Sequence, residues 1–490
     1  RIGHSARYRS RPSRALMIYS LASKTQLLTL IAFHLALYLP MIGHGLVFDD
    51  FRHLYSAAFQ SLQYGLTRVQ GGPFFDPLVW LTFKADWMLW GGRSFPMAAE
   101  NLLLHVANIV MLYFLTLRLW QSQIAAWWAA LGFALLFPAN TWAVMYIATR
   151  GHVIGAFFYL GALVAALGYV HAMRHQVMAG IVVIVCAGLS VFAKESGVTV
   201  IAAVFIMLAC ERQSLKQKVF SRGDILLFIG LAGVLAVYLG LRAQSGAVTP
   251  SAPDDNYSYA LSLSRLGDNL LRYAWRTYGL LAIVACAIGA SQYLRGVRPQ
   301  LRLLTRRDVF LSMMLFAVTL GPFLLLSVRS ATYSYLPGMA AALLLGAVAR
   351  SLYAAPAKPR PLPVALTSLP IILVVASLMA FTIGQSLKWV LMGDVSRAVL
   401  DQIAAQQPQV KPNTSVVLKY SEADREHRFP DAFPGGVFRD AVRLLYRDPS
   451  LDGKIIRRGE PYSIGEASSE IQLEYIVVDR QPTIRMASRN

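Results

Sequence analysis

Two adjacent aspartates, Asp49 and Asp50, follow an apolar run at 27–48 and open a longer loop at 49–100 that is rich in Trp, Phe and Pro. If the apolar run crosses a membrane, both carboxylates lie at its outer boundary. A carboxylate that is held there and partly shielded from water can take a proton from a hydroxyl group, as a general base does. The alternative is a solvated helix end with no catalytic role. We favour Asp50 as the base because it lies further into the loop.

Two cations follow in short loops that we expect on the same side of the membrane. Arg150 lies just ahead of His152, and Lys194 is followed by Glu195. A guanidinium binds phosphate through parallel hydrogen bonds, and an ammonium binds it as a point charge. We therefore take all four residues as candidate substrate-binding residues. Arg150 could instead pair with an aspartate of the first loop, and Lys194 could be neutralised by Glu195, so both interpretations stay open.

Three further candidates lie in the segment 328–338, which we also place on the outer side. Arg329, Tyr333 and Tyr335 could line a pocket for a sugar or a phosphate, although tyrosines at this depth are usually interfacial anchors.

A polar stripe lies in the apolar segment 101–117. Asn101, His105 and Asn108 are spaced by four and three residues, so they share one face of a helix. Polar groups at membrane depth need partners, which favours contacts between helices. His105 could also help to orient the site.

The composition indicates a polytopic membrane protein. The chain has 490 residues, of which 56% are hydrophobic and only 15% charged, and its mean hydropathy is +0.48. Apolar stretches long enough to cross a bilayer as helices recur along the chain. We predict a mainly α fold, a transmembrane helical bundle of about eleven spans, at 26–48, 101–117, 123–138, 153–170, 177–193, 197–210, 225–241, 273–293, 309–327, 336–350 and 364–386.

The net charge of +20 is distributed asymmetrically. Basic clusters at 1–24, 212–222, 295–307 and 350–360 fall on one side of the predicted bundle, whereas the loops 49–100 and 244–272 are near neutral or acidic. This is the positive-inside pattern, so we expect a cytoplasmic N-terminus. An odd number of spans then places the C-terminus outside. No aromatic-interleaved basic patch indicates nucleic acid.

Three regions follow from this pattern. We expect a basic cytoplasmic segment at 1–25, a catalytic transmembrane domain at 26–388 whose outer loop 49–100 forms short interfacial helices, and a small periplasmic α/β domain at 389–490. Strand patterns at 415–420 and 471–478 and a helical pattern around 438–445 support the last. That domain shows no nucleophile elbow, metal-ligand cluster or phosphate loop. The three cysteines lie inside spans and indicate neither disulfides nor a metal site.

Six short stretches in this order resemble the GT-C glycosyltransferases, in particular the branch of the protein O-mannosyltransferases and their bacterial relatives. The resemblance covers about 48–340, and its stretches are Phe48-Asp49-Asp50, 76–90, 101–108, 137–151, Ala193-Lys194-Glu195 and 333–337. In that family an acidic residue of the first outer loop is taken as the catalytic base, which implies Asp49 or Asp50. The chain departs from the pattern at Thr332, where the family usually has Arg, and it lacks the tetratricopeptide tail of some members.

The resemblance implies a hexosyl- or pentosyltransferase of the bacterial inner membrane. It would move a sugar from a polyprenyl-phosphate carrier in the lipid bilayer to a periplasmic acceptor, which is a glycan, a lipid or a protein. Arg150 and Lys194 would offset the charge on the leaving phosphate. The sequence requires no cofactor, although the paired carboxylates could hold a divalent cation.

A membrane transporter or flippase of a lipid-linked glycan is the main alternative, and a GT-C polymer ligase is a nearer one. The spans show no internal repeat, and the polar residues collect at the outer boundary instead of the midplane, which disfavours a transporter.

The predicted topology can be tested without a substrate. A phosphatase reporter fused after Asn490 should be active, whereas one fused near Arg302 should be inactive, because the enzyme folds only outside the cytoplasm. A well-expressed but inactive C-terminal fusion would mean that one span is miscounted.

Overall fold

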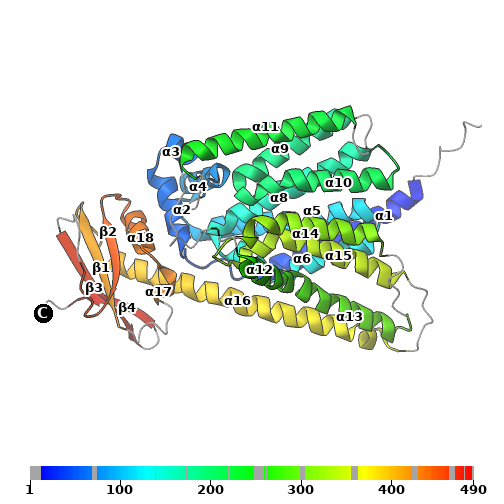
Figure 1. Ribbon diagram of the computed structural model, residues 1–490. Coiled ribbons are helices and arrows are strands. Elements are labelled where there is room, and N and C mark those ends of the chain that lie inside the picture. The colour runs from blue at the N-terminus through cyan, green and yellow to red at the C-terminus, as the bar shows by residue number, and fades with distance from the viewer. Residues whose placement is uncertain are drawn as a thin grey trace, which may run out of the picture.

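The computed structural model describes most of the chain and supports a helical membrane domain followed by a small α/β domain (Figure 1). The described residues are 13–68, 74–137, 139–171, 175–218, 221–247, 259, 262–297, 304–354, 362–421, 429–462, 469–478 and 481–487.

The membrane domain is a bundle of helices, most of which are long and apolar. They are α1 (Ser13–Tyr38), α5 (Ser94–Trp120), α6 (Gln123–Ala134), α8 (Arg150–His171), α9 (Gln176–Ala193), α10 (Val200–Ser214), α11 (Arg222–Ser245), α12 (Leu263–Ala274), α13 (Leu280–Leu294), α14 (Arg306–Leu324), α15 (Tyr335–Tyr353) and α16 (Val364–Gln406). A helix satisfies its own backbone hydrogen bonds, so these apolar sequences can enter lipid in this form. Reciprocal caps by Ser221 with Asp224 and Thr305 with Asp308 begin α11 and α14.

Each of the eleven predicted spans overlaps a helix, but the observed helix ends differ from the predicted ones. Within the described residues, eight helices are long and apolar enough to cross a membrane, or nine if α6 and α7 (Ala139–Met145), bent by 68° to each other, form one span. The first prediction, 26–48, extends too far, because α1 ends at Tyr38. Helices usually end at or before the residue that precedes a proline, and Pro40 follows.

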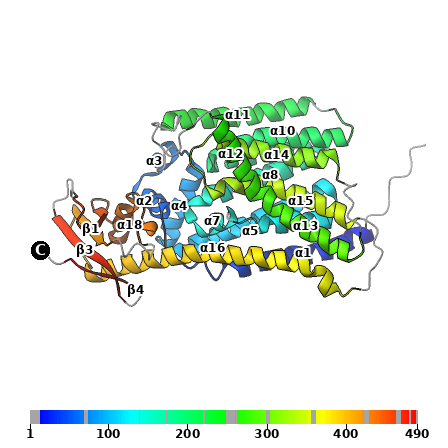
Figure 2. The same ribbon diagram turned by 60° about the horizontal axis from the view of Figure 1, so that its bottom comes forward.

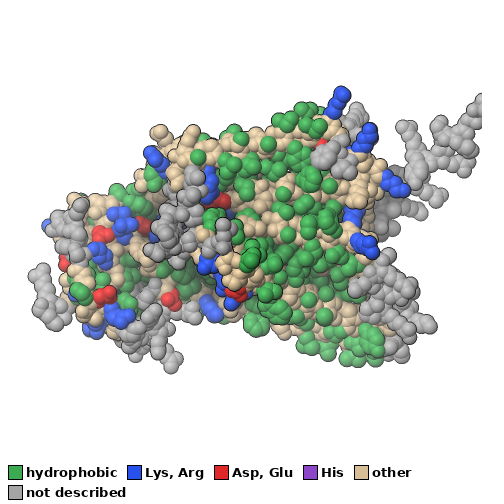
Figure 3. All heavy atoms as spheres, viewed as in Figure 1, with side chains coloured by type: hydrophobic (Ala, Val, Ile, Leu, Met, Phe, Trp, Pro, Cys, Tyr) green, Lys and Arg blue, Asp and Glu red, His purple; other side chains and the backbone are tan. Residues whose placement is uncertain are grey.

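Short helices cover one end of the bundle, which we call the outer end. They are α2 (Asp49–Phe59), α3 (Leu62–Thr67), α4 (Pro77–Trp90) and α7, followed by 3-10 turns η1 (Ile147–Thr149), η3 (Glu195–Thr199) and η5 (Ala331–Ser334). The C-terminal domain lies at this same end, and Figure 2 shows α16 running along the bundle into it. Charged side chains gather at the two ends of the molecule, with an apolar band between them (Figure 3).

The C-terminal domain contains one four-stranded sheet. Its strands β1 (Thr414–Tyr420), β2 (Asp452–Arg457), β3 (Ser469–Val478) and β4 (Gln481–Met486) are ordered β2-β1-β3-β4. β1 is parallel to β2 and β3, and β3 is antiparallel to β4. Helices α17 (Phe429–Ala432) and α18 (Val437–Tyr446) complete it. The expected strands and helix are therefore present, and the predicted boundary at 388 falls inside the continuous helix α16.

A close contact between two glycines fixes the segment that leads to Asp49. A Cβ atom added to Gly45 would lie 2.2 Å from the carbonyl oxygen of Gly393, and one added to Gly393 would lie 2.6 Å from that of Gly45. Backbone therefore packs on backbone here, which a larger residue would prevent. The contact joins the segment ahead of α2 to the middle of α16.

This contact generates a stability prediction with a control on the same helix. Gly393→Ala should lower the free energy of unfolding by about 1–3 kcal/mol, because the added methyl group would collide with the backbone at Gly45. Gly384→Ala should be neutral or stabilise by up to about 1 kcal/mol, since helical Ala is favoured over Gly and nothing lies within 4 Å of an added Cβ there. Thermal unfolding of both variants in detergent measures the difference. Equal melting temperatures would contradict the close crossing.

Candidate active site

A cleft of about 330 Å³ opens at the outer end between the short helices and the tip of the C-terminal domain. The residues of its wall are far apart in the sequence. They meet here because they lie at helix ends on the same side of the bundle. Its polar lining residues include Asp49, His53, Asp76, His152, Lys194, Arg329 and Tyr333. Five of the ten candidate site residues therefore share one cleft.

Asp49 presents its carboxylate to this cleft. Its side chain is 46% exposed, and its Oδ2 atom accepts a hydrogen bond of 3.0 Å from the Tyr146 hydroxyl. Its Oδ1 atom lies 3.5 Å from a guanidinium nitrogen of Arg52. The carboxylate is thus held from two sides while it stays open to a ligand, which suits proton transfer.

Asp50 has the opposite environment. Its side chain is completely buried, and its two oxygens accept backbone N–H groups of Val47 at 3.1 Å and Ala148 at 2.7 Å. Burial raises the pKa of Asp50 to about 8. Such a shift is common among catalytic carboxyls, but Asp50 does not line the cleft. Its contacts instead tie the start of α2 to η1.

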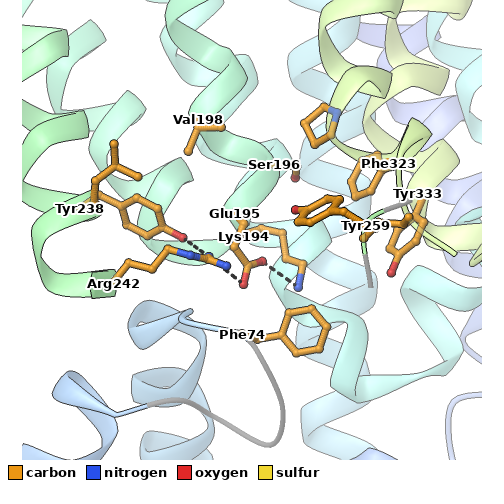
Figure 4. Close-up of a pocket in the computed structure, with 13 residues that line it drawn as sticks. Phe74, Lys194, Glu195, Ser196, Val198, Tyr238, Arg242, Tyr259, Phe323 and Tyr333 are labelled. Atoms are coloured by element: carbon orange, nitrogen blue, oxygen red, sulfur yellow. Dashed lines mark hydrogen bonds and ion pairs between the residues drawn. The ribbon is translucent and has the colours of Figure 1, made fainter. Parts of the chain in front are cut away.

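Lys194 and Glu195 form the centre of a charged row. The Lys194 ammonium lies 3.2 Å from a Glu195 oxygen and 4.3 Å from the ring centroid of Phe74. Arg242 of α11 lies 3.4 Å from the other Glu195 oxygen and donates a hydrogen bond to the Tyr238 hydroxyl (Figure 4). Burial would raise the pKa of Glu195, but Lys194 and Arg242 outweigh it and hold that pKa below its usual value.

A second cavity, of about 260 Å³, lies behind this row. Apolar side chains of α11 and α14, together with Tyr259 and Leu326, form most of its wall, and Lys194, Glu195 and Arg242 form its polar end. It shares Phe74, Lys194 and Tyr333 with the first cleft. These three side chains therefore form the partition between an apolar chamber and the chamber that holds Asp49.

Two further ionisable residues face the cleft. Asp76 is 6% exposed, its Oδ1 atom has no hydrogen-bond partner, and burial raises its pKa to about 6. His53 stacks on Phe83 at 4.9 Å between ring centroids, and burial lowers its pKa to about 4, so it is neutral near pH 7. The described residues contain no group of three or more His, Cys, Asp or Glu that could hold a metal ion.

Arg150 lies outside the cleft, in a buried ion-pair network. Its side chain is 1% exposed; it pairs with Asp86, lies 3.3 Å from Glu100, and donates to the Asn101 side chain at 3.0 Å and to the Met97 carbonyl at 3.0 Å. Of the two interpretations of Arg150, this geometry matches the ion pair, but the partner is Asp86 of α4, not Asp49 or Asp50.

Tyr335 and His105 form a second buried network, also away from the cleft. The Tyr335 hydroxyl contacts His105 Nδ1 at 2.6 Å and accepts a hydrogen bond from Asn108 at 3.1 Å. His105 Nε2 lies 2.9 Å from His34 Nε2. These contacts join α1, α5 and α15 inside the bundle, as the polar stripe of α5 predicts for contacts between helices.

The remaining candidates line the cleft opposite Asp49. Tyr333 stacks on Phe323 at 4.3 Å and lies 5.9 Å from His152. Arg329 donates to Asn269 at 2.7 Å and pairs with Asp268.

Sequence reasoning missed His53, Asp76 and Arg242. Asp76 lies in the Asp-Pro stretch that carries part of the resemblance, so it could have been selected, whereas nothing near Arg242 distinguishes it from other cations at helix ends.

Comparison with solved structures supports the fold. The chain is similar to ArnT from Cupriavidus metallidurans, with a TM-score of 0.50, 14% identity and coverage of 89% of this chain and 87% of that chain for the form bound to undecaprenyl phosphate. The apo form gives a TM-score of 0.50, 14% identity, and 91% and 88% coverage. The chain is also similar to the oligosaccharyltransferase AglB from Archaeoglobus fulgidus, in complex with an inhibitory peptide and a dolichol-phosphate. That match has a TM-score of 0.48 and 13% identity, and it covers 89% of this chain and 64% of that chain.

Neither a protein-family model nor a curated protein sequence matches the chain. The likeness to ArnT confirms the predicted fold, a multi-pass helical membrane domain with a small C-terminal domain.

The environment of Arg150 predicts a stability effect. Arg150→Gln should lower stability by about 3–5 kcal/mol, because it leaves the buried Asp86 carboxylate without its counter-charge. Replacing both partners, as in Arg150→Met with Asp86→Leu, should cost less than Arg150→Gln alone. Melting temperatures in detergent provide the comparison. A stable Arg150→Gln protein with a weakened affinity only for an anionic ligand would instead assign Arg150 to ligand binding.

Proposed function

We propose that this protein is a glycosyltransferase that moves a sugar from a polyprenyl-phosphate carrier to an acceptor hydroxyl. The observation that carries the proposal is the pair of adjoining chambers. One is apolar with a cationic end, and the other holds a restrained, accessible carboxylate. A donor with a long apolar chain, a phosphate and a sugar needs these environments in this order. The similarity in fold to ArnT, which was solved bound to undecaprenyl phosphate, supports the same substrate class.

The donor phosphate would lie at the partition, beside Lys194. Arg242 adds a second cation at the polar end of the apolar chamber. The phosphate gains negative charge as its bond to the sugar breaks, and cations fixed at that place stabilise the transition state. Glu195 lies between the two cations and keeps them in place before the donor binds.

Asp49 would be the general base. The acceptor hydroxyl attacks the anomeric carbon, and Asp49 takes the hydroxyl proton. The bond between the anomeric carbon and the phosphate oxygen breaks, and the polyprenyl phosphate leaves with the electron pair. We prefer Asp49 to Asp50 because a general base must first be within reach of the hydroxyl group, and its pKa matters only after that. Asp49 lines the cleft, whereas both oxygens of Asp50 are occupied by backbone amides.

The charge asymmetry of the loops supports a site on the face opposite the cytoplasm. The resemblance implies a bacterial inner membrane, where that face is periplasmic. The acceptor would then be a periplasmic glycan, lipid or protein that reaches the cleft between α2 and the C-terminal domain. A flippase would need polar groups along a path through the membrane. The polar residues that line the two chambers instead gather at the outer end.

Matched substitutions of the two aspartates test the base. Asp49→Asn keeps the size and the hydrogen bond from Tyr146 but cannot accept the proton, so transfer should fall by about a hundred- to ten-thousand-fold. Asp50→Asn should retain more activity, because Asp50 does not line the cleft, although its amide can keep only one of the two hydrogen bonds from backbone N–H groups. Initial rates with a polyprenyl-phosphate sugar give the answer. Near wild-type rates for Asp49→Asn would exclude Asp49 as the base.

Neutralising Lys194 tests the phosphate contact. Lys194→Gln should weaken donor use by about 1.5–3 kcal/mol, the value of one charge-assisted hydrogen bond, and should affect acceptor use far less. Lys388→Gln is the control, since Lys388 is an exposed lysine of α16 whose ammonium donates a hydrogen bond of 3.3 Å to the Gln385 side chain. The apparent KM for donor and acceptor separates the two effects. Equal changes in both constants would argue against a phosphate role.

A further inference from the structure

The C-terminal domain packs directly on the helix that begins with Asp49. Phe51 of α2 is 2% exposed and belongs to the same apolar cluster as the core of the C-terminal domain. Its ring stacks on Phe433 at 5.5 Å between centroids. One turn further along α2, the Tyr55 hydroxyl accepts a hydrogen bond of 3.3 Å from Arg443 of α18. The two parts of the molecule therefore share a core at α2.

Phe48, the residue before Asp49, has an unusual backbone conformation. Its φ is 50°, which is rare for a bulky residue and persists only where the surroundings enforce it. Its N–H donates to the Ala432 carbonyl of the C-terminal domain at 3.1 Å. Its ring packs edge-on against Tyr146 and Trp389, at 5.7 and 5.6 Å between centroids. This bend turns the chain so that Asp49 lines the cleft.

Arg52 connects the carboxylate of Asp49 with the C-terminal domain. Its guanidinium lies 3.5 Å from Asp49 on one side and 4.0 Å from Asp440 of α18 on the other. Asp440 is 4% exposed, so the protein holds this carboxylate in place. The orientation of Asp49 thus depends on a charge that the C-terminal domain supplies.

We propose that the C-terminal domain positions Asp49, through the hydrogen bond from Phe48 to Ala432 and the Asp49–Arg52–Asp440 row. Arg52 and Asp440 are positioning residues in this account, since they act through Asp49. The domain also contributes Pro434 to the wall of the cleft. The link to catalysis rests on the proposed function, whereas the link to the conformation of 47–52 does not.

Two readouts on the full-length protein in nanodiscs test the proposal. The variants are Arg52→Gln and Asp440→Asn, with Arg52→Lys as the conservative variant. The control is Asp452→Asn, in the same domain, where the carboxylate pairs with Lys454 on the strand β2. Hydrogen–deuterium exchange of the peptide that spans 47–52 reports the conformation, and kcat and KM with a polyprenyl-phosphate sugar report its effect.

Both test variants should exchange about tenfold faster at 47–52, because the local structure opens more readily. Their kcat should fall about ten- to a hundredfold with KM nearly unchanged, since a small misplacement of a reacting group is costly. Arg52→Lys should recover part of kcat, and Asp452→Asn should change neither readout.

Unchanged exchange at 47–52 in both folded variants would overturn the proposal, as would the same change in the Asp452→Asn control. If the wild-type protein transfers no sugar, the proposed function fails, but the exchange measurement still decides whether the C-terminal domain holds this segment.

Discussion

The architecture depends on how the chain turns between α1 and α2. This turn carries no helix to satisfy its backbone, yet it must place Asp49 within a fraction of an ångström. The contact of Gly45 with Gly393 anchors it to α16, and the backbone bonds of Asp50 anchor it to η1. Because α16 continues into the C-terminal domain, the same helix sets the position of both the turn and the domain that packs on α2.

Buried charge is arranged differently in the two halves of the outer end. Each nitrogen of the Arg150 guanidinium has a partner, and such a buried network is a weak source of net stability but is costly to break. Around Lys194 the charges border two chambers and remain partly accessible, at 13% and 21% exposure for Lys194 and Glu195. The first arrangement holds α4, α5 and α8 together, and the second is suited to binding an anion.

The sequence predicts the helices well, because a run of apolar residues of the right length has one stable form in lipid. Other features also depend only on neighbouring residues, so the sequence predicts them as well. They are the strands at 415–420 and 471–478 and the ion pair between Lys194 and Glu195. Partners of buried charges are not local. Arg150 pairs with Asp86, 64 residues away, and nothing in either neighbourhood distinguishes Asp86 from other carboxylates. The difference between Asp49 and Asp50 is also invisible in the sequence, since it follows from the conformation of Phe48.

Release of the lipid phosphate is the most direct test of the central claim that the two chambers serve one transfer reaction. Purified protein would be incubated with a panel of polyprenyl-phosphate sugars and a membrane-derived acceptor extract, and the free polyprenyl phosphate would be measured by mass spectrometry. We expect release from at least one donor, with an equal amount of sugar appearing in the acceptor fraction. Transport of an intact lipid-linked sugar across a vesicle bilayer, without release from any donor, would contradict the account.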